Sequence, residues 1–245
     1  MQPPKHYTKT SITEAVIDLR VEIPSEVTLS TLRSLQSSVE SHYPVCEDVV
    51  AFQGQFQAGL SIAATASQSL IGYRFSSSDK KQIFQVRLDG FTFSRLAPYE
   101  RWESFRDEAR RLWDIYQVAI NPKSVNRVAV RYINRLDLPL PFNDLKDYLR
   151  TVPEVSPDLP QGLSDYFMQL QIPQEDLQGM LVLNETLMPP PEDNVVSVLL
   201  DIDLFCEVNF PGDKNAQWDL LEQLRVRKNE VFEACITDST RRLLK

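Results

Sequence analysis

The chain has 245 residues, of which 42% are hydrophobic and 24% are charged, and its formal net charge is −8. This composition is ordinary for a globular protein, and the acidity argues against a nucleic-acid partner, because binding phosphates requires clustered cations. No apolar run approaches the roughly 20 residues of a membrane helix. The N-terminus lacks the apolar core of a signal peptide, and the three cysteines show no paired spacing, so we expect a cytoplasmic protein with no membrane contact.

The first half of the chain is predicted to form a strand, a helix, three strands and a second helix. The expected ranges are Glu14–Ile23, Thr28–His42, Val50–Ile62, Leu70–Phe75, Lys81–Leu96 and a helix that begins at Pro98. Strands are inferred from alternating apolar residues, and helices from apolar residues three and four apart. Within the last strand the apolar parity changes between Leu88 and Phe91, which predicts a β-bulge at Gly90.

The second half repeats this order of elements. We predict strands at Arg127–Leu138, Tyr166–Ile172, Met180–Thr186 and Val195–Val208, a short helix at Leu145–Arg150, and a long helix from about Asn215 to Cys235. The clearest strand is Val195–Val208, because its even-numbered residues from Val196 to Val208 are all apolar.

Short matching segments suggest an internal duplication. Ile17–Pro24 resembles Tyr132–Pro139, an offset of 115 residues (132 − 17), and Leu88–Phe91 resembles Ile202–Phe205, an offset of 114 (202 − 88). A near-constant offset indicates a repeated unit. We therefore predict two βαβββα halves, 1–122 and 123–245, which form one intimate domain.

The expected fold class is α+β, with an antiparallel sheet that carries its helices on one face and leaves a saddle-like open face. The order of elements resembles the TATA-binding-protein-like fold. This analogy concerns topology and implies no shared function.

Residues typical of catalytic and metal sites are scarce. The chain has two histidines, no Cys-x-x-Cys or His-x-x-x-His motif and no glycine-rich phosphate loop, so no cofactor and no catalytic residue is predicted. Asp201 and Asp203 share one strand face and are weak candidates for an oxygen-only Mg²⁺ or Ca²⁺ site. The alternative is that they pair with arginines on a neighbouring strand.

The open sheet face is the main candidate for binding. Its predicted polar residues are Gln53, Gln55, Gln57, Gln85, Arg87, Arg127, Arg131, Arg135, Gln169 and Gln171. Arginine and glutamine side chains recognise carboxylates, phosphates and amides. The alternative is an ordinary hydrated outer face, on which polar residues simply alternate with core residues.

Four parts of the chain together resemble a sporadically distributed family of uncharacterised bacterial proteins of similar length. They are Pro4 with Thr13–Arg20, Phe93–Phe105, Arg131–Asn134 with Leu138-Pro139, and Arg227–Phe232 with Ile236–Asp238. The resemblance spans nearly the whole chain, and Ser94-Arg-Leu-Ala-Pro-Tyr99 is its most specific part. It implies a bacterial cytoplasmic protein but no defined activity.

These patterns favour a non-enzymatic binding or interaction protein, with regulation, defence or toxin neutralisation as its candidate roles. The expected partner is another protein, and a homo-oligomer is an open alternative. The other hypotheses are a ligand- or nucleic-acid-binding saddle and a metal-dependent enzyme that uses Asp201 and Asp203. We expect Arg127, Arg131 and Arg135 to be free for a partner, and Trp102, Phe105 and Leu112 to pack on Phe84, Val86 and Leu88.

Overall fold

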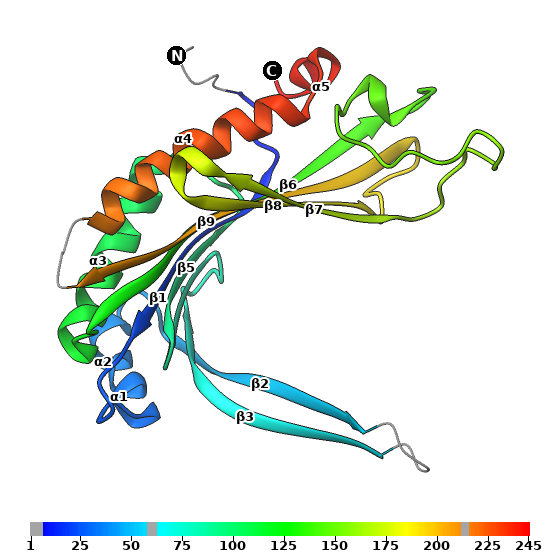
Figure 1. The fold of residues 1–245 in the computed structure, drawn as a ribbon. Helices are drawn as coiled ribbons and strands as arrows, with labels where there is room; N and C mark the ends of the chain where they lie inside the picture. Colours follow the sequence, from blue (N-terminus) through cyan, green and yellow to red (C-terminus); the bar gives the residue numbers. More distant parts are fainter. Residues whose placement is uncertain (1–6, 58–62, 212–215) are drawn as a thin grey trace.

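The computed structural model describes residues 7–57, 63–211 and 216–245. It has a single nine-stranded antiparallel sheet with the strand order β2-β3-β4-β5-β1-β6-β9-β8-β7 (Figure 1). The strands are β1 (Ile12–Glu22), β2 (Val45–Gln57), β3 (Ala63–Ser76), β4 (Gln82–Arg87), β5 (Gly90–Leu96), β6 (Ser124–Pro139), β7 (Phe167–Gln174), β8 (Gly179–Met188) and β9 (Val195–Pro211). The predicted α+β class is confirmed.

The first two helices of the chain are short, and one long helix follows the strands of each half. They are α1 (Leu29–Ser34), α2 (Gln36–Val39), α3 (Trp102–Ile120), α4 (Ala216–Cys235) and α5 (Asp238–Leu243), with 3₁₀ turns at Leu145–Asp147 and Glu175–Leu177. None of the described helices is both long and apolar enough to cross a membrane.

The sheet is strongly curved, and α3 and α4 lie along its convex side (Figure 1). The β2–β3 and β7–β8 hairpins project from its two ends, on either side of the concave face. Alternation places Ala15, Ile17 and Leu19 on the helix side, where all three are fully buried. The intervening residues of β1 therefore lie on the concave face.

Aromatic side chains of α3 fill the space between helix and sheet. Phe105 stacks on Phe93 with ring centroids 5.3 Å apart, and Trp113 meets the ring of Phe91 edge-on at 5.6 Å. Our prediction that Leu88 belongs to this core was wrong, because Leu88 is 36% exposed in the turn between β4 and β5.

That turn also replaces the bulge predicted at Gly90. The apolar parity changes there because one strand ends at Arg87 and a new strand begins at Gly90. A Cβ atom on Gly90 would lie 2.5 Å from the carbonyl oxygen of Leu19. Glycine is therefore required for the start of β5 to approach β1 this closely.

The predicted duplication is not confirmed. The first half places four strands between its helices, whereas the second half places three between a 3₁₀ turn and α4. Leu88–Phe91 forms a turn into β5, but Ile202–Phe205 lies inside β9. The TATA-binding-protein-like topology is likewise not confirmed. Each half does contribute one side of the sheet, because β1 and β6 pair at its centre.

Three predicted helices are shorter than expected. The single helix predicted over Thr28–His42 is divided into α1 and α2, and Leu145–Arg150 contains only a 3₁₀ turn. Helix α3 begins at Trp102 and not at Pro98. Around the α1–α2 break, the hydroxyl of Ser34 donates to the carbonyl of Thr31 (2.8 Å), and such side-chain bonds compete with regular helix.

A lysine lies within the core. Lys228 on α4 is 8% exposed, and its Nζ lies 3.8 Å from the centroid of the Tyr132 ring. No ion pair to Lys228 is found among the described residues. Burial, together with the nearby charge of Arg225, lowers the pKa of Lys228 to about 7.

Substituting Phe105→Ala should reduce the free energy of unfolding by about 3–5 kcal/mol, because it removes a buried aromatic ring and leaves a cavity. Chemical denaturation measures this change. Val118→Ala on the same helix is the control, since Val118 is 86% exposed and surface changes stay within about 0.5 kcal/mol. A loss below about 1 kcal/mol for Phe105→Ala would contradict the core assignment.

Substituting Lys228→Met should stabilise the protein at pH 7. The pKa of Lys228 is about 7 in the folded protein and 10.5 ordinarily. Between these pH values the unfolded chain binds the additional proton, so wild-type stability should rise as the pH increases from 7. Melting temperatures from pH 7 to about 9.5, below the tyrosine range, should show this rise in the wild type and a smaller one in the variant. Equal slopes would argue against a neutral buried lysine.

Candidate functional site

A hollow of about 710 Å³ lies on the concave face over β4, β5, β1, β6 and β9. Its charged lining residues are four arginines and three aspartates: Arg20, Arg87, Arg127, Arg131, Asp18, Asp89 and Asp203. The positive and negative charges are therefore nearly balanced here, although the whole chain carries −8.

The strand register brings these residues together. Asp18 on β1 lies opposite Thr92 on β5, Arg20 lies opposite Arg127 on β6, and Arg131 lies opposite Asp203 on β9. Residues directly opposite on antiparallel strands share a face and lie close enough for their side chains to interact.

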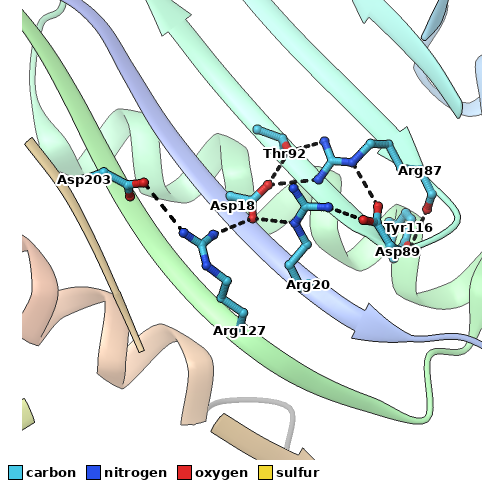
Figure 2. Close-up of polar contacts among 8 residues, drawn as sticks. All are labelled: Asp18, Arg20, Arg87, Asp89, Thr92, Tyr116, Arg127 and Asp203. Atoms are coloured by element: carbon cyan, nitrogen blue, oxygen red, sulfur yellow. Dashed lines mark hydrogen bonds and ion pairs between the residues drawn. The ribbon is translucent and has the colours of Figure 1, made fainter. Parts of the chain in front are cut away.

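Asp18 is the centre of the charged network (Figure 2). Its Oδ1 accepts hydrogen bonds from Arg20 Nε (3.1 Å) and Arg127 Nη1 (3.0 Å). Its Oδ2 accepts from Arg87 Nη2 (3.0 Å) and from the Thr92 hydroxyl (2.7 Å). One carboxylate thus holds three guanidinium groups from β1, β4 and β6 in place.

Asp89 is the second anion of the network. Its Oδ1 accepts from Arg87 Nε at 3.0 Å, and its Oδ2 pairs with Arg20 Nη1. On the helix side of the sheet, the Tyr116 hydroxyl donates to the backbone carbonyl of Arg87 at 3.4 Å. The arginine is therefore fixed by side chains on one face and by α3 on the other.

The surroundings of Asp18 keep it ionised. Its burial by itself would raise its pKa, but the charge of Arg20, the hydrogen bond from Thr92 and the charge of Arg87 together outweigh burial. The pKa of Asp18 is therefore held below its ordinary value of 3.8.

A β-bulge places Asn126 at the edge of the hollow. The pairing of β6 with β1 shifts here, because Arg20 and Val21 lie opposite Arg127 and Val125, so Asn126 is the extra residue of the bulge. Its side chain is exposed. Bulges redirect side chains and occur often beside functional sites.

A second hollow of about 760 Å³ adjoins the first. Arg20, Asn126 and Arg127 line both hollows, and the second one extends toward Gln178 and Glu207. The bulge therefore stands between two neighbouring depressions of the same surface.

The arginines predicted to be free are paired, so this expectation was wrong. Arg131 donates from Nε and Nη2 to the two oxygens of Asp201, at 2.8 and 2.6 Å. Arg127 also approaches Asp203 at 3.7 Å and stacks over Phe205, with its guanidinium carbon 4.3 Å from the ring centroid. The cross-strand register supplies these partners.

Arg135 lies outside the hollow and is also paired. Its Nε donates to Asp137 at 2.9 Å, and its Nη2 donates to the Ser197 hydroxyl (3.0 Å) and to the Pro189 carbonyl (3.1 Å). It therefore holds the segment before β9 against the sheet, and the structure does not unite it with Arg127 and Arg131 in one site.

The two candidate metal ligands have other partners. Besides Arg131, Asp201 accepts a hydrogen bond from Asn184 Nδ2 at 3.0 Å. Burial raises the pKa of Asp203, and Arg127 and Arg131 only partly offset this effect. Among the described residues there is no group of three or more His, Cys, Asp or Glu side chains placed to hold a metal ion.

The predicted glutamines are distributed over the whole sheet. Gln85 lines the hollow, whereas Gln169 and Gln171 lie on β7 at the sheet edge. Gln53, Gln55 and Gln57 belong to β2, and their side chains lie outside the described part of the structure. Of the predicted binding residues, the structure therefore brings together Arg87, Arg127, Arg131 and Gln85.

Sequence reasoning missed Asp18, Arg20, Thr92 and Asn126. A signal for the bulge was present, because the buried residues Val125 and Val128 are three apart and interrupt the two-residue alternation of β6. Asp18 and Arg20 had the parity of the open face, but no feature of the sequence distinguished them from other polar strand residues.

No protein-family profile matches the chain, and no curated protein is similar to it. The resemblance to the bacterial family described above therefore stays a prediction.

Substituting Asp18→Asn should destabilise the protein by about 3 kcal/mol at pH 7, because it removes the central charge from three partly buried arginines. The pKa of Asp18 is lowered in the folded protein. The contribution of Asp18 to the free energy of unfolding should therefore be complete above its ordinary pKa, and should disappear as the pH falls through the pKa of the folded protein. Urea denaturation at pH 7 and pH 3 measures both effects.

Asp114→Asn is the matched control, because Asp114 is exposed on α3 and should change stability by less than about 0.5 kcal/mol. If Asp18→Asn behaves like this control, Asp18 does not organise the site.

Proposed function

We propose that the protein is a non-enzymatic binding protein whose partner docks on the concave face of the sheet. The main support is the hollow around Asp18, which strands from both halves of the chain build. Binding sites formed by ordered strands hold their polar groups in fixed positions before the partner arrives.

The lining of the hollow suits binding better than catalysis. The described residues that line it include neither His nor Cys, and the Thr92 hydroxyl donates to Asp18. A nucleophile needs an adjacent base to activate it. The residues here are held in ion pairs and offer donors and acceptors for recognition.

The partner that fits this surface best is a protein. Arg131 (45% exposed), Arg20 (36%) and the exposed Asn126 offer donors, while Asp89 (62%) offers acceptors. A mixed array of this kind matches a protein surface that carries both charges and amides. It fits a nucleic acid poorly, because the cations are already neutralised by aspartates.

A ligand-binding role is the second candidate, and the two adjoining hollows around Asn126 favour it. Regulation, defence and toxin neutralisation are compatible with a protein-binding surface. A metal-dependent activity of Asp201 and Asp203 has little support, since Arg131 and Asn184 occupy the oxygens of Asp201.

Substituting Asn126→Trp should block the hollow while preserving every ion pair of the Asp18 network. The control is Val118→Trp, which adds the same bulky ring to an exposed position on the convex side. Each purified protein is immobilised and exposed to a lysate of the source organism, and bound material is identified by mass spectrometry and tested for nucleic acid.

We expect Asn126→Trp to lose a protein that the wild type and Val118→Trp both retain. The free energies of unfolding of both variants should stay within about 0.5 kcal/mol of the wild type, as for other surface changes. Equal retention by all three proteins would contradict binding through the hollow, and loss of a bound nucleic acid would favour the saddle alternative.

A further inference from the structure

The strand β7 forms one edge of the sheet, and apart from Pro173 near its end it lacks the usual protection of such edges. Among the described residues, its only backbone ladder is the one with β8. Edge strands normally carry charges or bulges that prevent pairing with another chain. The segment Phe167–Ile172 has the sequence Phe-Met-Gln-Leu-Gln-Ile, without a charged residue or a proline.

The side chains of β7 are also accessible. Phe167 is 68% exposed and Ile172 is 39% exposed, and Gln169 and Gln171 between them are exposed as well. An uncharged strand with exposed apolar residues and an open row of backbone groups is suited to strand addition.

The sequence of β7 is complementary to itself about Leu170. In an antiparallel pair centred there, Leu170 faces its own copy, Gln169 faces Gln171, Met168 faces Ile172, and Phe167 faces Pro173. Each apolar residue thus meets an apolar residue. Each amide meets another amide, which can both donate and accept a hydrogen bond.

We propose that two copies of this protein associate through antiparallel pairing of their β7 strands, about a two-fold axis near Leu170. Such an interface is isologous, because the same strand serves both copies. The nine-stranded sheets then form one continuous sheet, and the concave faces of both copies lie on the same side.

The charge of the protein favours β7 over the opposite edge. Each copy carries a net charge of −8, so self-association requires a surface without negative charge. The opposite edge strand, β2, carries Glu47 and Asp48 in its described part, which pair with Arg74 (2.8 Å) and Arg33 (3.9 Å) of the same chain, so this edge is charged where β7 is not. This proposal does not rest on the proposed function of the hollow, which lies on other strands.

The test is sedimentation velocity of the full chain across the micromolar range. The wild type should approach twice its chain mass of 28.2 kDa, and added salt should strengthen the association by screening the net negative charge. A wild type that stays monomeric at every concentration and salt level would overturn the proposal.

The decisive variant is Gln169→Lys with Gln171→Lys, which places four lysines around the two-fold axis. Like charges directly opposite on paired strands repel, so the dimer dissociation constant should rise by about tenfold or more. The variant Gln169→Asn with Gln171→Asn keeps the amides and should keep the dimer.

The control for added charge is Val118→Lys with Ser38→Lys, two exposed positions on α3 and α2. It should dimerise like the wild type. A dimer that survives the two β7 lysines would place the interface elsewhere and overturn the proposal.

Hydrogen exchange of the wild type provides an independent measurement if the lysine variant fails to fold. Amides in Phe167–Ile172 should exchange more slowly at high protein concentration than at low concentration, because pairing protects them. Exchange in this segment that does not depend on protein concentration would contradict the proposal. It would contradict it also if the true partner of β7 is a strand from a different protein.

Discussion

The pairing of β1 with β6 is the contact on which the rest of the structure depends. These two strands come from the two halves of the chain and lie next to each other at the centre of the sheet. Their register fixes Arg20 opposite Arg127 and aligns Asp18 with both neighbouring strands. The helices α3 and α4 then cover the side on which Ile17 and Val130 are buried, so the same pairing forms the core and the hollow.

Periodicity was sufficient to predict the fold class, most strands and the two long helices. The alternation in β1, β6 and β9 identified which face is buried, because side chains of a strand alternate between the two faces. Periodicity was insufficient at Leu88–Gly90. The tight turn found there changes the apolar parity in the same way as the predicted bulge would. The predicted duplication rested partly on that segment, and its two matching pieces occupy different structural positions.

The sequence was sufficient to predict which face of the sheet carries the candidate site, but not which side chains contact each other there. The parity of Arg127 and Arg131 placed them on the open side, as found. Their partners depend on the register between strands, which is set by long-range pairing and is not visible in either strand alone. For this reason Asp18, which lies more than a hundred residues before Arg127, was not recognised as the centre of the network, and the arginines were expected to be free.

The bulge at Asn126 also concerns how the chain tolerates insertions and deletions. A bulge increases the local twist and bends its strand, so this extra residue affects the curvature of the sheet as well as the edge of the hollow. Removing one residue there would leave Val125 two positions before Val128, so both would still face the helices, and the loss would fall on the local twist and the edge of the hollow. A one-residue deletion at this point of β6 should therefore spare the core and alter the curvature of the sheet beside the hollow.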